Sequence, residues 1–283
     1  MNFKLHAPAK INLRLEVLGK RPDGYHDLRM LMVKLALGDT LEGALTSGAM
    51  QLTSDQPGFP CDETNLLWKT CDLVRRESGQ KFGMTLHVTK RIPMAAGLGG
   101  GSSDAGTLLV HLNQALGLGW SGERLIALAR GLGADVPFFT VPGSQWAEGV
   151  GERLTPVQTP SLCLVLVNPR FPVSTPEIFK KWGKSPLTRP QGDDNHRLSF
   201  RGWREILPLL RNDLEAVTID SYPAVGLVKQ AFHTRGADGV LMSGSGPTVF
   251  GIFENKAKQE AAYQELKVRY PEWWVCCTEL LGD

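Results

Sequence analysis

The stretch PMAAGLGGGSSDAGTLL, residues 93–109, decides how this chain is interpreted, because four glycines at positions 97–101 are followed directly by a helical pattern. Leu108, Leu109, Leu112 and Leu116 recur at helical spacing, which predicts a helix from Ser103 to a stop at Gly117. Glycines let backbone N–H groups approach a ligand, and a helix N-terminus adds partial positive charge. The segment therefore predicts a phosphate-binding loop, with a close-packed turn that binds nothing as the alternative.

Three common nucleotide-binding signatures do not fit this segment. A Walker A loop needs Gly-Lys-Ser/Thr at the helix start, and the chain has no lysine from residue 91 through 179. The dinucleotide fingerprint needs a third glycine where Ser102 stands, and the HRD and DFG signatures of protein kinases are absent. A distant cation must offset the phosphate charge, and Lys10 in APAKINL is the candidate, although a plain surface lysine is the alternative.

Composition indicates an ordinary globular protein and disfavours several classes. The 283 residues carry 31 Lys+Arg against 29 Asp+Glu, a net charge of +2, which argues against nucleic-acid or membrane-surface binding as the main task. No apolar run approaches the roughly 18 residues of a membrane span, and residues 1–10 do not resemble a signal peptide. Five cysteines and six histidines lack metal-ligand spacing, so a reduced, cytoplasmic protein is expected.

The remaining patterns predict a mixture of strands and helices. The first third is interpreted as strands, including a half-buried one at residues 11–17 that ends in a turn at 19–24. Prolines mark a boundary at 155–161, and residues 184–196 form a polar loop. Further strands are expected at 84–88, 162–167, 240–242 and 248–253, and helices at 121–131, 206–210 and 255–268.

Four motifs in order resemble the GHMP family of small-molecule kinases: APAKINL at 7–13, the glycine-rich segment, GADVPFF at 133–139 and SGSGPTVF at 243–250. The resemblance implies an α+β, two-domain fold. Residues 1–154 would form an N-terminal, ribosomal-protein-like β/α domain that binds ATP through the glycine-rich loop. Residues 161–283 would form a C-terminal, ferredoxin-like α/β domain, with the active site in the cleft between the two.

Within this family the chain is most similar to members that act on a cytidine-diphosphate sugar alcohol. RPDGYHDL at 21–28, LGGGSSDA at 98–105 and EGVGERL at 148–154 are typical of them. The resemblance implies ATP-dependent phosphorylation of the 2-hydroxyl of cytidine-diphosphate methylerythritol in the non-mevalonate isoprenoid pathway. It also implies ATP and Mg²⁺ as cofactors, without identifying the Mg²⁺ ligands.

Carried over by position, the resemblance makes Asp135 the catalytic carboxylate and Lys10 its neighbour. A nearby cation would keep the carboxylate ionised, able to accept a proton or to hold the acceptor hydroxyl for in-line attack. Phosphoryl transfer depends mainly on positioning and charge stabilisation, so Lys10 would also serve the developing negative charge. The alternative for Asp135 is a carboxylate that only satisfies local N–H groups.

The remaining site residues follow from the same resemblance. Tyr25 and His26 would recognise cytosine, Phe179 would close the other face of the base, and Thr175 and Asn12 would contact substrate. Core packing is the alternative for Phe179, and exposure in a turn for Tyr25 and His26. The expected ATP contacts are Asn65, Leu66 and Lys90 around adenine, and Pro93, Met94, Ala95, Ala96, Gly97, Leu98, Gly99, Gly100, Gly101, Ser102 and Ser103 around the phosphates.

Two features depart from the family pattern, and one glycine turn allows two interpretations. Ala95 and Ala96 stand where glycine is common, so both are expected to have negative φ. Asp104 stands where asparagine is frequent and is expected to cap the helix that follows the loop. SGSGP is expected near the active site, with a simple hairpin turn as the alternative.

Two other functions remain as alternatives at this stage. A homoserine or mevalonate kinase would share the glycine-rich segment but would not need the RPDGYHDL segment or a pair of aromatic rings around a base. A non-catalytic RNA-binding module would share only the ribosomal-protein-like fold. The net charge of +2 and the presence of Asp135 with its glycine-rich loop disfavour RNA binding.

Overall fold

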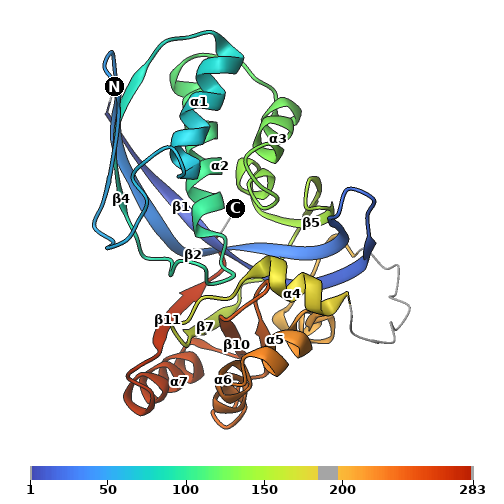
Figure 1. Ribbon diagram of the computed structural model, residues 1–283. Helices are drawn as coiled ribbons and strands as arrows, with labels where there is room; N and C mark the ends of the chain where they lie inside the picture. Colours follow the sequence, from blue (N-terminus) through green and yellow to red (C-terminus); the bar gives the residue numbers. More distant parts are fainter. Residues whose placement is uncertain (1, 184–196, 282–283) are drawn as a thin grey trace. The chain divides into compact units, whose positions relative to one another are not determined.

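The computed structural model describes residues 2–183 and 197–281, and the predicted polar loop at 184–196 lies outside the described residues. The chain forms two compact units (Figure 1). Unit 1 holds residues up to 9, 37–94 and 99–142, and unit 2 holds 10–36, 95–98 and those from 143 on. The long strands β1 (Asn2–Lys20) and β2 (His26–Thr46) contribute residues to both units. The division into 1–154 and 161–283 stays a prediction.

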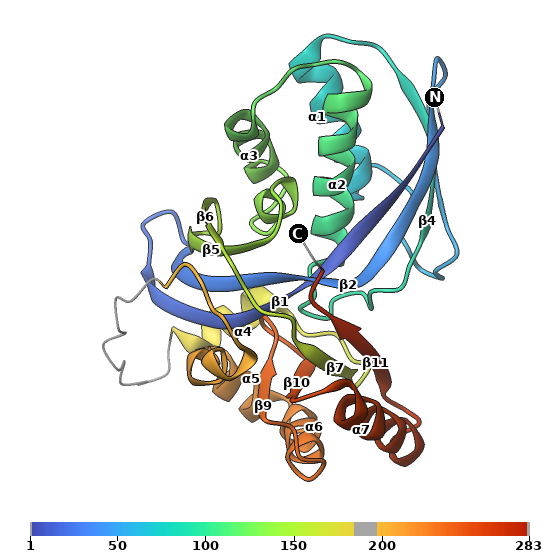
Figure 2. The same ribbon diagram turned by 180° about the vertical axis from the view of Figure 1, so that it is seen from behind.

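Unit 1 is a sheet covered on one face by helices (Figures 1 and 2). Strand β4 (Gly83–Thr89) pairs antiparallel with the C-terminal part of β2 and parallel with β3 (Met50–Ser54). The expected strand at 84–88 is thereby confirmed. The covering elements are α1 (Leu66–Ser78), α2 (Gly100–Ala115), α3 (Gly122–Arg130) and the 3-10 turn η1 (Pro137–Thr140). Apolar side chains such as Leu52, Leu67, Leu86 and Leu112 form the core between helices and sheet.

Helix α1 was not expected, because the first third of the chain is interpreted as strands. Its signals are in the sequence: Asn65 is the N-cap, Gly79 ends the helix with a φ of 69°, and Leu67, Cys71 and Val74 are buried at helical spacing. The capping residues and the 3.6-residue period of buried side chains therefore indicate a helix here, even though the segment has no long apolar run.

Strand β1 confirms the expected strand but not its half-buried character. Residues 7–13 are buried at every position, so odd- and even-numbered side chains both point away from solvent. Alternation of apolar and polar residues predicts one solvent face only when nothing covers that face. Lys10 and Asn12 are thus buried polar residues, and the alternative of a surface lysine at position 10 is wrong.

The helix expected at 121–131 is present, whereas the helix expected at 206–210 is not. Helix α3 follows its expected cap, since Ser121 Oγ accepts a hydrogen bond from the Arg124 backbone N–H at 3.2 Å. The helix expected at 206–210 is wrong: this region forms the short 3-10 turns η2 (Trp203–Glu205) and η3 (Leu207–Leu209). Pro208 lacks the N–H that a continuing α-helix would use.

Unit 2 contains the other ends of β1 and β2. There β2 pairs antiparallel with β5 (Ser144–Gly149), β5 pairs with β6 (Arg153–Val157), and β1 pairs parallel with β8 (Arg211–Asn212). Residues 155–157, which the prolines mark as a boundary, lie in β6. Pro156 has no N–H to donate to a neighbouring strand. It is tolerated because β6 is an edge strand, which pairs with β5 on one side.

The second sheet of unit 2 is antiparallel, in the order β11-β7-β10-β9. It confirms the expected strands at 162–167, 240–242 and 248–253 as β7 (Cys163–Asn168), β9 (Gly239–Met242) and β10 (Val249–Phe253), beside β11 (Trp274–Glu279). Helices α6 (Ala224–His233) and α7 (Lys256–Arg269) pack on this sheet, and α7 confirms the helix at 255–268 (Figure 2). The shorter helices are α4 (Thr175–Trp182) and α5 (Glu215–Ser221). Within residues 2–183 and 197–281, no helix is long and apolar enough to cross a membrane.

Leu112→Ala tests the packing of α2 in unit 1. The Leu112 side chain is fully buried, so truncation leaves a cavity and should lower the free energy of unfolding by about 2–5 kcal/mol. Urea denaturation measures the change. Leu227→Ala is the matched control, because Leu227 on α6 is 59% exposed and should change stability by no more than about 0.5 kcal/mol. Equal losses in both variants would contradict this description of the core.

Candidate functional site: a glycine-rich loop before helix α2

The glycine-rich segment forms a tight loop that leads into α2. Gly97 and Gly99 have φ angles of 75° and 71°, in the left-handed region that favours glycine. Gly99 is the N-cap of α2, and no described side chain caps this end of the helix. The first N–H groups of a helix lack partners within it and, together with the helix dipole, attract anions. The loop and helix therefore have the geometry of an anion-binding site.

Ala95 contradicts the expected backbone conformation. Its φ is 52°, whereas Ala96 keeps a negative φ, as expected. A non-glycine residue in the left-handed conformation costs about 1–2 kcal/mol. The fold of the loop thus determines the conformation at position 95, although alanine is less suited to it than glycine.

In unit 2, Gly97 packs against the SGSGP turn. A Cβ atom at Gly97 would lie 2.3 Å from the Ser243 carbonyl oxygen, and Ser243 Oγ donates a hydrogen bond to the Gly97 carbonyl at 2.9 Å. The turn also joins β9 to β10, so the hairpin interpretation and packing against the glycine-rich loop both hold. Lys10 lies beside them, since its backbone N–H donates to the Leu98 carbonyl at 2.9 Å.

The start of α2 offers an unpaired hydroxyl and open space. Ser103 is fully buried, and its Oγ has no hydrogen-bond partner among the described residues. A Cβ at Gly101 would meet nothing within 4 Å, whereas one at Gly100 would lie 3.1 Å from Ile92 Cγ2. A buried polar group without a partner is costly. These features fit a ligand that brings hydrogen-bonding oxygens, such as a phosphate.

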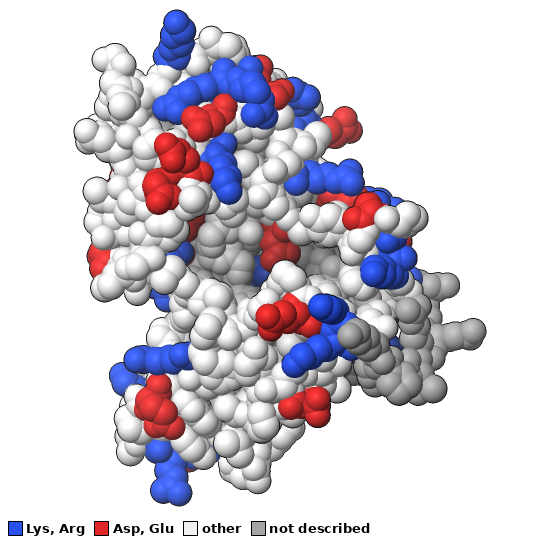
Figure 3. Space-filling view, in the orientation of Figure 1, with Lys and Arg blue, Asp and Glu red and all other residues white. Residues whose placement is uncertain are grey.

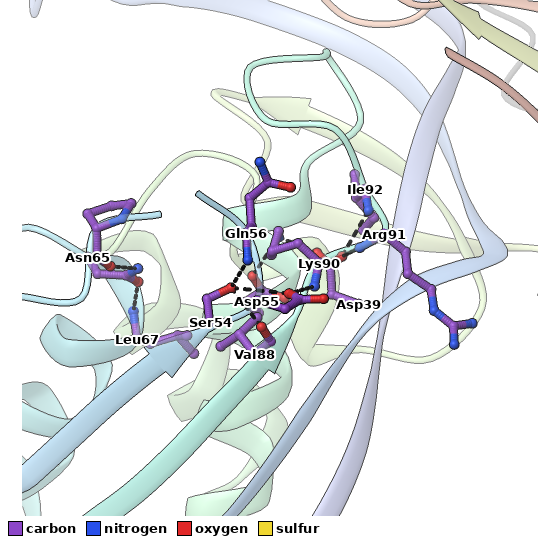
Figure 4. Close-up of polar contacts among 12 residues, drawn as sticks. Asp39, Ser54, Asp55, Gln56, Asn65, Leu67, Val88, Lys90, Arg91 and Ile92 are labelled. Atoms are coloured by element: carbon purple, nitrogen blue, oxygen red, sulfur yellow. Dashed lines mark hydrogen bonds and ion pairs between the residues drawn. The ribbon is translucent and has the colours of Figure 1, made fainter. Parts of the chain in front are cut away.

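Lys90, Asp39 and Asp104 form a buried charge cluster in unit 1, of which Figure 4 labels Lys90 and Asp39. The Lys90 ammonium donates to Asp39 Oδ2 and, at 3.0 Å, to Asp104 Oδ2. The expectation that Asp104 caps α2 is wrong: Gly99 is the N-cap, and Asp104 lies inside the helix, paired with Lys90. Only 4% of the Lys90 side chain is exposed, whereas the residue as a whole is half-buried. The solvent-accessible surface of Lys90 therefore belongs mainly to its backbone atoms.

Asn65 and Leu66 stand at the start of α1 (Figure 4). Asn65 Oδ1 accepts from the Leu67 N–H at 2.9 Å, and its Nδ2 donates to the Pro60 carbonyl at 2.7 Å. Leu66 is partly buried and packs against the core of unit 1. The Asn65 amide is thus used in capping the helix, and the expected contact of these residues with adenine stays a prediction.

Lys10 and Asp135 belong to different units. In unit 2, Lys10 is 4% exposed and its ammonium donates to Asn12 Oδ1 at 2.8 Å. In unit 1, the half-buried Asp135 lies in the turn between α3 and η1, which is closed by a hydrogen bond from the Val136 N–H to the Gly133 carbonyl at 3.2 Å. The pairing of Lys10 with Asp135 stays a prediction.

Two of the residues expected to contact a base, His26 and Phe179, lie in contact in unit 2. The His26 ring stacks on Phe179 with centroids 4.9 Å apart and planes at 24°. Phe179 is half-buried rather than part of the core, and Tyr25 is 62% exposed. Burial and then the charge of Lys20 lower the pKa of His26, which favours a neutral imidazole that can donate and accept hydrogen bonds.

Trp182 completes this aromatic group and was missed by the sequence analysis. Its ring meets the edge of His26 at 90°, with centroids 5.9 Å apart. The signal is the spacing of Phe179 and Trp182, three residues apart on α4. Thr175, at the start of the same helix, shares a hydrogen bond of 2.7 Å with Ser245 of the SGSGP turn.

The surface of the described residues carries charges of both signs (Figure 3). Lys and Arg are interspersed with Asp and Glu on the face shown in Figure 3. Within residues 2–183 and 197–281, no group of three or more His, Cys, Asp or Glu side chains is placed to hold a metal ion. The described residues therefore supply no ready-made protein cage for a metal.

The sequence matches two family descriptions. Residues 65–143 match the GHMP kinases N terminal domain, and residues 196–272 match the GHMP kinases C terminal domain. A protein of Geobacter metallireducens named 4-diphosphocytidyl-2-C-methyl-D-erythritol kinase is 44% identical, with 99% of each chain covered. One of the same name from Geobacter sp. strain M21 is 46% identical, covering 92% of this chain and 93% of the relative.

Solved structures give the same comparison in three dimensions. A crystal structure of 4-(cytidine 5'-diphospho)-2C-methyl-D-erythritol kinase has a TM-score of 0.80 at 33% identity, covering 99% of this chain and 100% of that one. Homoserine kinase from Cytophaga hutchinsonii has a TM-score of 0.73 at 17% identity, covering 99% and 94%. The second similarity shows the fold alone.

Gly97→Ala and Gly101→Ala form a matched pair that tests the loop geometry. At Gly97 the added Cβ meets the Ser243 carbonyl and φ is positive, so the free energy of unfolding should fall by about 1–3 kcal/mol. At Gly101, inside α2 with nothing within 4 Å, alanine should leave stability unchanged or raise it by up to about 1 kcal/mol. Thermal denaturation measures both. A stable Gly97→Ala variant would show that the loop does not need this close approach.

Proposed function

Because the chain belongs to the GHMP kinase family and, within it, to the 4-diphosphocytidyl-2-C-methyl-D-erythritol kinases, we propose that it transfers the γ-phosphoryl group of ATP to the 2-hydroxyl of 4-diphosphocytidyl-2-C-methyl-D-erythritol. The products are the 2-phosphate and ADP, in the non-mevalonate isoprenoid pathway. The observation that carries this proposal is the loop at residues 93–103, whose glycines lead into an uncapped helix N-terminus. The full-length similarity selects the acceptor.

The loop would bind the ATP phosphates mainly through its backbone. Left-handed Gly97 and Gly99 turn the chain, and the N–H groups of the first turn of α2 would face a bound phosphate. The orphaned Ser103 hydroxyl would supply a further hydrogen bond. Adenine would lie near Asn65, Leu66 and the accessible backbone of Lys90.

Asp135 and Lys10 would act on the acceptor hydroxyl. Asp135 would hold the hydroxyl for in-line attack and accept its proton. The buried Lys10 ammonium, held by Asn12 and lying next to the SGSGP turn, would stabilise negative charge that develops during transfer. A positively charged group in a buried setting acts strongly because little water screens it.

The aromatic residues of unit 2 would recognise the cytosine ring. Phe179 and the exposed Tyr25 offer two flat faces, and His26 offers hydrogen bonds to the edge of the base. A neutral imidazole suits an uncharged base. Thr175 and Asn12 would contact the remainder of the acceptor.

Mg²⁺ belongs to the proposal as a companion of ATP. No cluster of three metal-binding side chains is present in the described residues, and Mg²⁺ in kinases takes many of its ligands from substrate phosphates and water. The bound ion would supply charge neutralisation on the phosphates. The contacts proposed for the glycine-rich loop are made by the chain's own residues and do not involve the ion.

The function is tested by measuring ADP release from ATP and Mg²⁺ with one acceptor at a time: 4-diphosphocytidyl-2-C-methyl-D-erythritol, homoserine, mevalonate and none. We expect ADP release that depends on the cytidylyl acceptor, with the phosphorylated product confirmed by mass spectrometry. Turnover with homoserine or mevalonate instead would overturn the proposed acceptor. No turnover with any of them would overturn the reaction itself.

Asp135→Asn and Lys10→Met test the two catalytic assignments. Each should lower kcat by at least about 100-fold while leaving the thermal unfolding temperature within a few degrees of the wild type. Lys4→Met is the control for the lysine, because the Lys4 side chain is 72% exposed, and it should keep the wild-type kcat. A normal kcat in either site variant removes that residue from the reaction.

Phe179→Ala tests the aromatic contact with the acceptor. Loss of the stacking face should raise the KM for the cytidylyl acceptor by about tenfold, which corresponds to about 1.4 kcal/mol, and leave the KM for ATP nearly unchanged. Phe171→Ala is the control, since Phe171 stacks on Tyr222 instead, with centroids 5.3 Å apart. Equal rises in both KM values for Phe179→Ala would assign Phe179 a packing role only.

A further inference from the structure

The Lys90, Asp39 and Asp104 cluster, named the ion clamp below, is almost completely buried. The exposed fractions of these side chains are 4%, 0% and 2%. Taking charges out of water is costly unless they are paired and hydrogen-bonded. A cluster of buried charges is therefore expected to have a role in the fold or in the reaction.

At one end of the glycine-rich loop, Asp39 fixes the chain just before it. Asp39 Oδ1 accepts hydrogen bonds from the Arg91 N–H at 2.6 Å and from the Ile92 N–H at 2.9 Å (Figure 4). The other oxygen of this carboxylate accepts from the Lys90 ammonium. Asp55, an exposed carboxylate, also accepts from the Lys90 backbone N–H at 2.9 Å. Residues 90–92 are thus held through their backbone N–H groups and through the Lys90 side chain.

At the other end of the loop, Asp104 joins α2 to the same ammonium. Asp104 follows directly after the segment 93–103, and its Oδ2 lies 3.0 Å from Lys90 Nζ. One lysine side chain therefore ties the end of β4 to the beginning of α2. A glycine-rich loop has high conformational freedom when it is not held, and fixing its ends removes much of that freedom before a ligand binds.

The ion clamp contains one more carboxyl group than ammonium group. Two carboxylates meet one ammonium, and Asp104 Oδ1 has no hydrogen-bond partner among the described residues. Burial, together with the charge of Asp39, raises the pKa of Asp104 to about 7, although Lys90 opposes the shift. Asparagine at position 104 would keep an oxygen acceptor for Lys90 without the surplus charge.

We propose that Lys90, Asp39 and Asp104 are positioning residues of the kinase: they clamp both ends of the glycine-rich loop and so hold it ready for the ATP phosphates. The proposal rests on the proposed function, because it assumes that the loop binds ATP. Neither carboxylate needs to touch ATP. The role of the Lys90 side chain is in the clamp, and only its backbone is available to adenine.

The test compares Asp104→Leu, which removes the acceptor, with Asp104→Asn, which keeps it. For Asp104→Leu we expect the KM for ATP to rise by about tenfold and the KM for the cytidylyl acceptor to stay within about twofold. For Asp104→Asn both values should stay within about twofold of the wild type. Lys90→Met should behave like Asp104→Leu.

Two comparisons separate the clamp from a loss of stability. Leu112→Ala destabilises the same unit without touching the ion clamp, so below its unfolding temperature it should keep the wild-type KM for ATP. If Lys90→Met does not fold because it leaves two buried carboxylates without a cation, the double variant Lys90→Met/Asp104→Leu takes its place, because it leaves only the Asp39 carboxylate, which still accepts from the Arg91 and Ile92 N–H groups. The same rise in the KM for ATP is expected.

An unchanged KM for ATP in Asp104→Leu, or an equal rise in both KM values, would overturn the clamp. The rise in unfolding temperature on adding ATP is a second measurement, and it should be smaller for Asp104→Leu than for the wild type and for Asp104→Asn. This readout needs no turnover, so a wild type that binds ATP but phosphorylates no acceptor would defeat the proposed function and still leave the clamp testable.

Discussion

Backbone N–H groups can bind a phosphate only if the chain that carries them is held in place, and this requirement explains much of the structure around the glycine-rich loop. The four glycines of the loop have no side chains that could hold it. Its conformation is set from outside: Asp39 and Lys90 hold one end, Asp104 the other, and Ser243 meets Gly97 in the middle. The cost of ordering glycines is thus met during folding rather than during binding.

Buried polar residues around the loop illustrate the same constraint. Lys10, Asn12, Ser103 and the ion clamp are all removed from water. Each charge has a partner of opposite charge or a hydrogen-bond acceptor, whereas Ser103 Oγ and Asp104 Oδ1 have none within the described chain. Buried polar atoms without a hydrogen-bond partner are uncommon in folded proteins, and two of them lie next to each other at the start of α2.

Several features of the site could be predicted from the sequence because they depend on local chemistry. The glycines, the helix that follows them and the cap at Ser121 were all identified in this way, and the four motifs indicated the GHMP family, which the similarity of the whole chain confirms. The positive φ of Ala95 and the pairing of Asp104 were predicted incorrectly. The pairing of Asp104 depends on Lys90, fourteen residues earlier in the chain, and the conformation of Ala95 follows from the fold of the whole loop.

The sequence by itself determined the glycine-rich turn before α2, the family and most of the elements, since short-range spacing and residue type control turns, caps and amphipathic faces. Only the tertiary structure decided that β1 is buried along residues 7–13, that His26 stacks on Phe179 beside Trp182, and that Asp39 belongs to the loop. Asp39 lies more than fifty residues before Ile92 in the chain. No local pattern encodes a hydrogen bond between residues so far apart, because it forms only when the sheet pairs β2 with β4 and places the two segments side by side.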